Sequence, residues 1–257
     1  MSTSNITSGG AMKGAMKFGI ILTLALGGLF AVAFILLASQ TSGGVTVAQL
    51  VKGLFAADSL QFWWYLTRAA GLAGYFLLWL STAWGLLVST KFLDALLDRT
   101  FTYDFHEYLS LLGLGFILLH IIVLMFDHFA PLSILQILIP FVEPYRPFWV
   151  GLGIISFYLT VLVTVTFYMR SQIGMSAFRK IHYLSLVGYA GATLHGLYAG
   201  TDSVLPAANF LYKGTFLVTL FLLLYLLFTL WYKKREEREQ QLALARRRSK
   251  RPRASYR

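Results

Sequence analysis

Long apolar stretches dominate the pattern of hydrophobic and polar positions along the chain, and short polar segments separate them. Six of these stretches are long enough to cross about 30 Å of hydrocarbon as helices of roughly 20 residues. They lie at about 18–38, 65–89, 106–126, 148–169, 181–199 and 211–232. We therefore expect an all-α membrane protein with six transmembrane helices.

Composition supports this interpretation and divides the chain into three parts. Charged residues make up 13% of the chain, about half of their share in soluble domains, and no stretch between the apolar runs is long enough for a soluble domain. We expect a cytoplasmic N-terminal segment at 1–17, one transmembrane domain at 18–232 and a basic cytoplasmic tail at 233–257. The first apolar run exceeds the roughly 7–15 residues of a signal-peptide core, so we interpret it as an uncleaved anchor.

The distribution of lysine and arginine predicts that both termini are cytoplasmic, because basic residues are enriched in cytoplasmic loops. The side shared by the two termini carries Lys13, Lys17, Lys91, Arg99, Arg170, Arg179 and Lys180, in addition to the tail. The opposite side carries Lys52, Arg68, Arg146 and Lys213, spread over three loops or span ends. We expect a multi-pass protein of the plasma membrane.

The net charge of +11 arises mostly in the tail. Residues 233–257 contain eleven basic and three acidic residues, so the tail contributes +8 of the +11. Basic runs can bind nucleic acid. A basic segment next to a membrane span is instead attracted to anionic lipid headgroups, by about 1 kcal/mol per Lys or Arg. We therefore expect the lipid bilayer and no nucleic acid as its partner, with an acidic cytoplasmic protein left open.

Two of the expected helices each carry an inner and an outer histidine. His106 and His120 lie fourteen residues apart in the third span, and His182 and His195 lie thirteen residues apart in the fifth. Both spans run outward, so separations of about 21 and 19.5 Å bring the four histidines to two matching depths. Ionisable residues inside a span are costly and normally mark a site. His128, just past the third span, has no partner at its level, and we interpret it as structural.

Imidazoles that meet across an apolar bundle at two depths favour bis-histidine haem. Neutral imidazole nitrogens bind haem iron from both faces of the macrocycle, and a bundle supplies the apolar slot. One feature conflicts with this hypothesis: in a straight helix, His182 and His195 point about 140° apart. Crossing, tilt or a local bulge of the helix would remove the conflict. Nearby glycines, which suit either a macrocycle or close helix packing, are Gly113, Gly115, Gly188, Gly191 and Gly196.

The segments HEYLSLLGLGFILLH (106–120) and RKIHYLSLVGYAGATLHGL (179–197) resemble the ferric reductase-like transmembrane domain superfamily. That superfamily includes ferric reductases, NADPH oxidases and the haem-binding membrane subunit of the bacterial methionine-sulfoxide reductase system. It carries such histidines on the third and fifth helices of a six-helix bundle. TRAAGLAGYFLLWLSTAWGLL and GLGIISFYLTVLVTVTF are also similar, so the resemblance covers about residues 63–232. It implies that His106 and His182 hold an inner haem b, and His120 and His195 an outer one.

The resemblance also implies electron transfer, here with a separate donor. Ferric reductases and NADPH oxidases continue into a module that binds FAD and NADPH, whereas this sequence has no G-x-G-x-x-G after a strand. We therefore expect an oxidoreductase subunit, a membrane cytochrome b. It would take electrons from a separate flavoprotein reductase or a quinol and pass them to an extracytoplasmic acceptor. FMN or a quinone stays open as a further cofactor.

Two features near the outer histidines complete the predicted site. Haem propionates are anionic, and Arg68, at the start of the second span, is the best cationic candidate on the outer side. Arg99, Arg179 and Lys180 are the inner candidates; all four residues could instead serve only topology. The outer loop 130–147 is too apolar for a solvated loop and breaks at Pro140. We expect it to cover the outer haem, to dock a partner or to form a plain interfacial helix.

Two functions of other classes stay open. The first is a metal-ion transporter that uses the same histidines, although transporters usually add carboxylates within the membrane. Here Asp104 and Glu107 lie only at the inner end of the third span. The second is a haem-free structural subunit. The chain has no cysteine, which excludes disulfides and thiolate metal sites.

Overall fold

The computed structural model describes residues 62–126 and 132–249, and every regular element in this part of the chain is a helix. The longer helices are α3 (Phe62–Ser89), α4 (Arg99–Leu124), α6 (Pro147–Tyr168), α9 (Leu184–Tyr198) and α10 (Pro206–Ser249). The shorter ones are η1 (Phe92–Ala95), α5 (Ile134–Leu138), α7 (Arg170–Ile173), α8 (Met175–His182) and η2 (Thr201–Val204). The predicted all-α fold is thereby confirmed.

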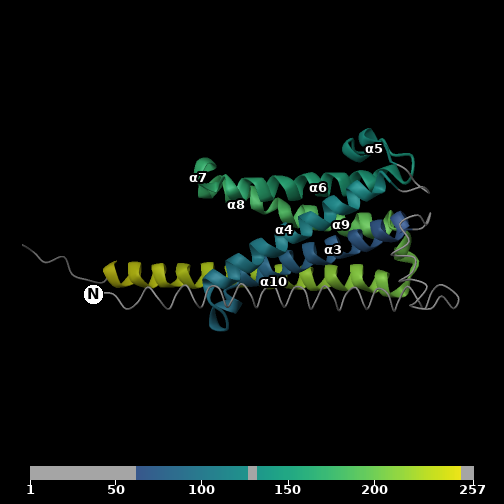
Figure 1. Cartoon of the computed structure of the whole chain (residues 1–257). Coiled ribbons are helices and arrows are strands. Elements are labelled where there is room, and N and C mark those ends of the chain that lie inside the picture. Colours follow the sequence, from purple (N-terminus) through teal and green to yellow (C-terminus); the bar gives the residue numbers. More distant parts are fainter. Residues whose placement is uncertain (1–61, 127–131, 250–257) are drawn as a thin grey trace, which may run out of the picture.

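Two antiparallel helix pairs build the bundle (Figure 1). α4 folds back along α3, and α9 lies along α6. The first pair is close because glycines face the opposite backbone. A Cβ on Gly74 would lie 3.1 Å from the Ile117 nitrogen, and a Cβ on Gly113 would lie 3.4 Å from the Leu78 nitrogen. Small residues of this kind let helices approach closely where no hydrophobic effect drives them together.

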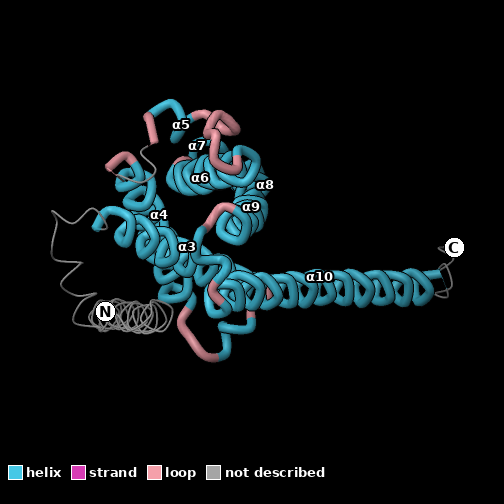
Figure 2. The backbone as a smooth tube through the Cα atoms, turned by 90° about the vertical axis from the view of Figure 1, so that its right-hand side faces the viewer, coloured by secondary structure: helices cyan, strands magenta, loops and turns pink. Residues whose placement is uncertain are grey.

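A buried cluster of hydroxyl groups ties α10 to α3 and α9. Tyr75 Oη lies 2.6 Å from Thr215 Oγ1 on α10, and 3.3 Å from both Tyr189 Oη and Thr193 Oγ1 on α9. A buried hydroxyl without a partner costs about 1–3 kcal/mol, so these bonds favour one arrangement of the three helices. Figure 2 shows α6 and α9 nearly end-on while α10 runs off to the side, so α10 is inclined to that pair.

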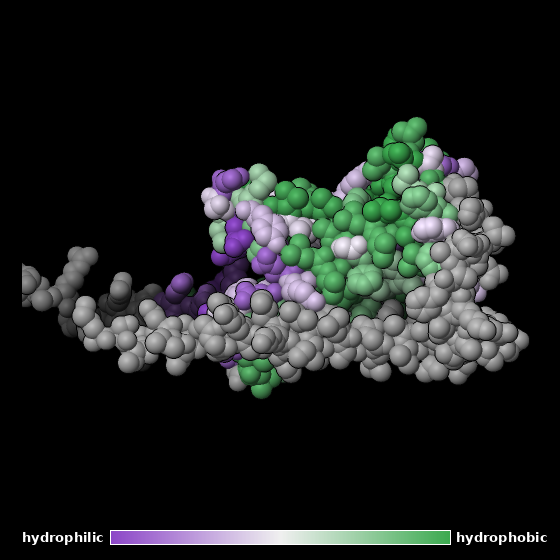
Figure 3. Space-filling view, viewed as in Figure 1, coloured by the Kyte–Doolittle hydropathy of each residue, from purple (hydrophilic) through white to green (hydrophobic). Residues whose placement is uncertain are grey.

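Four helices are long and apolar enough to cross a membrane: Phe62–Ser89, Arg99–Leu124, Pro147–Tyr168 and Pro206–Leu242. Large apolar side chains on α10 face outward, with Phe221 67% exposed and Leu217 62% exposed. In Figure 3, hydrophobic residues cover the side of the bundle and hydrophilic residues gather at the end where α7 and α8 lie. An exposed apolar surface of this extent marks contact with lipid or with a partner, and the helix lengths favour lipid.

The predicted spans agree with the helices except at the fifth. Spans two, three, four and six correspond to α3, α4, α6 and α10. The expected first span, 18–38, lies outside the described residues, as does the segment 1–17. The fifth, 181–199, is divided: α8 ends at His182, and α9 has 15 residues, fewer than the roughly 20 of a full span. Six spans and two cytoplasmic termini stay predictions.

Replacing Gly74 by alanine is expected to destabilise the α3–α4 pair. The added Cβ would meet the Ile117 side chain at 3.0 Å and its backbone nitrogen at 3.1 Å. Overpacking of this kind costs about 1–3 kcal/mol, so the melting temperature of the purified protein should fall. Gly115→Ala is the matched control because a Cβ there meets nothing within 4 Å. Equal melting temperatures for the two variants would contradict this packing.

Candidate functional site

The four predicted site histidines lie in two pairs, and α4 contributes one member to each. The imidazole rings of His106 and His182 have centroids 6.0 Å apart and planes at 77° to each other. His120 and His195 line the same cavity. The structure thus brings together the two pairs that were predicted from the depths of the histidines along the helices.

α8 and α9 meet at a one-residue irregularity between His182 and His195. α8 ends at His182, and α9 begins at Leu184. Across the irregularity, the Leu186 amide donates to the Tyr183 carbonyl at 3.2 Å, a bond between residues three apart that tightens the turn. Tyr183 keeps right-handed helical dihedrals, with φ −62° and ψ −20°, so the chain stays helical through a locally tightened turn. A local irregularity of this kind is one of the adjustments that the angle of about 140° in a straight helix calls for.

Three of the histidine rings lie directly against a glycine of the neighbouring helix. The Cβ of any larger residue would come close to a ring atom at each of these glycines. A Cβ would lie 2.9 Å from His120 Nδ1 if built on Gly71, 2.6 Å from His195 Nδ1 if built on Gly153, and 3.1 Å from His106 Cε1 if built on Gly85. The first two lie below any ordinary contact distance, so the outer rings occupy space that only glycine leaves.

The residue four positions before each glycine binds Nδ1 of the same histidine. The contacts are His120 Nδ1 to the Thr67 carbonyl at 2.9 Å, His195 Nδ1 to the Trp149 carbonyl at 3.0 Å and His106 Nδ1 to Ser81 Oγ at 3.3 Å. A carbonyl oxygen only accepts hydrogen bonds. Nδ1 of His120 and of His195 therefore carries the hydrogen, which leaves Nε2 with a free lone pair. Imidazoles held in this way are prepared to bind a metal through Nε2.

His182 is held less completely than the other three. Its Nδ1 atom is buried and has no hydrogen-bond partner in the part of the chain that the structure describes. The ring contacts Phe178, with centroids 5.3 Å apart, and His106 on the opposite side. Its orientation therefore depends on ring packing, whereas the other histidines each have a hydrogen bond at Nδ1.

A cavity of about 330 Å³ surrounds the outer pair between α3, α4, α6 and α9. This volume lies in the range of roughly 300–1,000 Å³ found for small-molecule sites. Its apolar lining includes Leu72, Ile117, Ile121, Val150, Ile154 and Phe157. Three charged residues, Arg68, Glu143 and Asp202, also line it. A mostly apolar wall with a few polar groups is typical of small-molecule sites.

The outer loop covers this cavity, which is one of the three outcomes left open by the sequence. Its residues Leu132, Gln136, Ile137, Glu143 and Tyr145 all line the wall. Phe141 anchors the loop on α6, because its ring occupies the space beside Gly151, where a Cβ would come within 2.4 Å. Glu143 Oε2 is buried and lacks a hydrogen-bond partner among the described residues. The loop thus places an unpaired carboxylate oxygen in the lining.

Arg68 lines the cavity and is already paired. Its Nε donates to Asp202 Oδ2 at 2.7 Å, and its Nη2 forms an ion pair with the other carboxylate oxygen. Its guanidinium lies 3.9 Å from the centre of the Trp64 ring. Arginine has five N–H donors, so the pair with Asp202 leaves donors for a second anion. Binding of a propionate by Arg68 stays a prediction.

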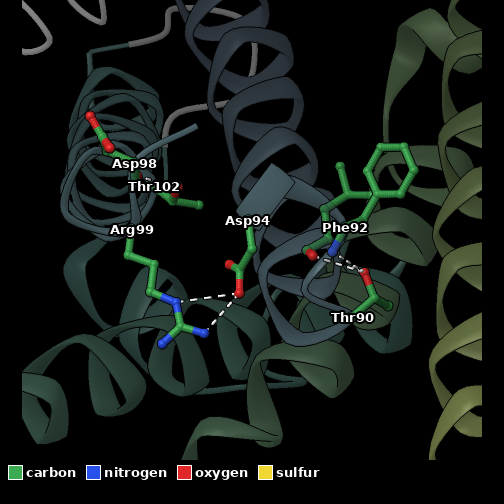
Figure 4. A network of polar contacts seen from close by, with 7 residues as sticks. Thr90, Phe92, Asp94, Asp98, Arg99 and Thr102 are labelled. Atoms are coloured by element: carbon green, nitrogen blue, oxygen red, sulfur yellow. Dashed lines mark hydrogen bonds and ion pairs between the residues drawn. The ribbon is translucent and has the colours of Figure 1, made fainter. Parts of the chain in front are cut away.

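At the opposite end of the bundle, a polar turn joins α3 to α4 (Figure 4). Arg99 reaches back to Asp94, with Nη2 2.8 Å and Nε 3.3 Å from Oδ2. Thr102 Oγ1 donates to the Asp98 carbonyl at 2.7 Å. Arg99, an inner candidate for an anionic group, therefore stabilises the turn. The two other inner candidates, Arg179 and Lys180, are exposed in the last turn of α8 beside His182.

Neither pair forms a conventional site for a bare metal ion. Across residues 62–126 and 132–249, no three His, Cys, Asp or Glu side chains come together as possible ligands. Protein zinc sites use three or four side-chain ligands. Two imidazoles suit a metal whose other coordination positions are filled by a macrocycle.

Sequence reasoning found the histidines and Arg68 but missed the groups that hold them. The carbonyls of Thr67 and Trp149 carry no sequence signal, because every residue has a carbonyl. The glycines do carry one: TRAAG, STAWG and WVGLG each place a histidine-binding residue four positions before a glycine. Residues four apart share one face of a helix. The repeated spacing therefore indicates where a ring lies against α3 or α6.

Comparisons with known proteins identify no family. No family model, no curated protein and no solved structure matches this chain. The chemistry of the site is therefore inferred from its geometry.

Removing Arg68 alone is expected to destabilise the outer end strongly. The Arg68 and Asp202 side chains are 17% and 8% exposed, so Arg68→Met leaves a buried carboxylate without its partner. Breaking a buried pair on one side costs about 3–5 kcal/mol, whereas replacing both charges with apolar residues is often neutral. The double variant Arg68→Met/Asp202→Leu should therefore melt at a higher temperature than Arg68→Met. The reverse order would show that the pair does not stabilise the fold.

Proposed function

We propose that this protein is a membrane cytochrome b that carries electrons across the bilayer through two bis-histidine haems b. His106 and His182 are the ligands of the inner haem, and His120 and His195 are the ligands of the outer haem. The observation that carries the proposal is the meeting of α4 histidines with histidines of α8 and α9 at two depths. The spacing of His106 and His120 corresponds to about 21 Å along α4, most of the thickness of the hydrocarbon core.

The histidine pairs fit residues that would hold haem iron through their imidazole nitrogens, and the haem would supply a one-electron carrier. The observed separation of the His106 and His182 rings is 6.0 Å. At the outer pair, the bonds from Nδ1 to the carbonyls of Thr67 and Trp149 leave Nε2 as the ligand atom.

The chain's own residues hold, orient and shield the cofactor. The glycines beside the rings let the histidines lie close to α3 and α6, and the bonds at Nδ1 fix the ring orientations and increase the basicity of Nε2. The mostly apolar walls, which include residues of the loop, would surround the cofactor at the outer site. Arg68 is placed to bind an anionic group of the cofactor at the outer end.

Electrons enter from a separate donor and leave to an extracytoplasmic acceptor, so the chain acts as an oxidoreductase subunit. The donor is a separate flavoprotein reductase or a quinol of the membrane, and FMN or a quinone stays open as a further cofactor. Support for this direction comes from the resemblance to the ferric reductase-like superfamily and from the basic residues assigned to the cytoplasmic side. The proposed location is the plasma membrane, with six spans and both termini inside.

A metal-ion transporter is the second candidate, and the site favours it less. Ion paths usually combine several ligating side chains, whereas no three His, Cys, Asp or Glu side chains come together in the part of the chain that the structure describes. The Glu143 carboxylate, buried in the outer lining, is the observation that keeps this candidate, because transporters use carboxylates at depth. A haem-free structural subunit would leave the matched histidine pairs without a role.

Reduced-minus-oxidised absorbance spectra with haem quantification test the proposed function. The purified chain is expected to hold two low-spin b haems. His106→Leu and His120→Leu should each hold at most one, because each removes one axial ligand. His128→Leu is the matched control and should retain both. Absence of haem after expression with ample haem would refute the proposal, and loss of metal uptake in His120→Leu would then support transport.

A further inference from the structure

Two serines form a closed set of hydrogen bonds with His106. Ser81 Oγ on α3 lies 3.3 Å from His106 Nδ1 and 2.7 Å from Ser110 Oγ on α4. Ser110 Oγ in turn lies 2.8 Å from the carbonyl oxygen of His106 itself. Ser81 is 5% exposed, so water does not readily replace these partners.

The donors in this set can be assigned, because each hydroxyl has one hydrogen to donate. The His106 carbonyl only accepts, so Ser110 donates to it. Ser110 then has no hydrogen left for Ser81, and Ser81 must donate to Ser110. Ser81 in turn has none left for the imidazole. The Ser81 oxygen therefore accepts from His106 Nδ1–H.

We propose that Ser81 and Ser110 are positioning residues that keep the hydrogen of His106 on Nδ1 and leave Nε2 free as the ligand atom. Backbone carbonyls accept the Nδ1–H hydrogen bonds of His120 and His195. A side-chain substitution leaves these carbonyls in place. At the inner pair the tautomer depends on two hydroxyl groups. The assignment of Nε2 to iron rests on the proposed function, whereas the position of the hydrogen on Nδ1 does not.

The inner pair depends on this bond more than the outer pair does. Both outer histidines have a carbonyl partner, whereas His182 has a buried Nδ1 with no partner in the described chain. His106 is therefore the one inner histidine whose tautomer is fixed by a hydrogen bond to a described residue. Partners at the non-ligating nitrogen of metal-bound histidines typically contribute 10–100-fold to metal affinity. Loss of the Ser81 hydroxyl should consequently weaken the binding of one of the two haems, the one held by His106.

The first test measures the tautomer without haem. NMR of the full chain, labelled with ¹⁵N-histidine and produced without haem, should show His106 protonated at Nδ1, with the signal assigned by its absence in His106→Leu. In Ser110→Ala, Ser81 is free to donate to Nδ1, so the lone-pair signal of Nδ1 should appear. Ser110→Thr should restore the original signal, because a threonine hydroxyl can bond the same carbonyl four residues back. A signal unchanged in Ser110→Ala would overturn the proposal.

The second test measures haem retention in the loaded protein. Ser81→Ala should release one of its two haems to a scavenging apoprotein at least about tenfold more readily than the unaltered chain. The remaining haem should be unaffected. Ser89→Ala is the matched control, because Ser89 lies on the same helix as Ser81 and its hydroxyl donates to the Gly85 carbonyl of that helix. Equal haem release from Ser81→Ala and Ser89→Ala would overturn the role of Ser81.

The two tests separate this inference from the proposed function. Nδ1–H at His106 in a chain that binds no haem would refute the cytochrome and support the assignment made to the serines. Two haems together with hydrogen on Nε2 of His106 would support the cytochrome and refute that assignment.

Discussion

An imidazole buried between apolar helices needs room for its ring and an acceptor for its N–H, and the whole bundle is arranged around these two needs. α3 and α6 meet both in the same way, with a glycine beside the ring and an acceptor four residues earlier. One helical turn separates residues that far apart, so both lie on the face toward the histidine. Other glycines, Gly74 and Gly113, let α3 and α4 approach each other closely. Glycine thus serves both helix packing and ring placement, at different positions.

The two ends of the bundle differ in how fully they enclose their histidines. At the outer end, the loop over the cavity and the Arg68–Asp202 pair close the site. At the inner end, α8 carries exposed basic residues beside His182, and the α3–α4 turn is polar. The two ends thus offer different surroundings to their histidines, a mostly apolar cavity at one end and polar, exposed groups at the other.

Much of this arrangement could be predicted from the sequence, because lipid imposes simple rules. Apolar runs located α3, α4, α6 and α10, and fourteen- and thirteen-residue spacings paired the histidines by depth. The tightened turn at Tyr183 could be predicted only as an unspecified tilt or bulge, since RKIHYLSL contains no proline or glycine that would place it. The hydrogen-bond acceptors of His120 and His195 could not be predicted either, because they are the backbone carbonyls of Thr67 and Trp149. Asp202 was missed because nothing near it in the sequence indicates that it meets a residue 134 positions earlier.

α10 continues as one helix from Pro206 to Ser249, so the basic tail begins as an extension of a membrane span. From Lys233 to Ser249 the helix extends by about 25 Å. A continuous helix resists bending, so a protein or lipid surface that binds residues 233–249 would tilt α10 as a whole. The tilt would be centred on the contact of α10 with α3 and α9, where Tyr75 meets Thr215. Force applied outside the membrane would therefore be felt beside the outer cavity, whose lining includes Tyr75 and Tyr212.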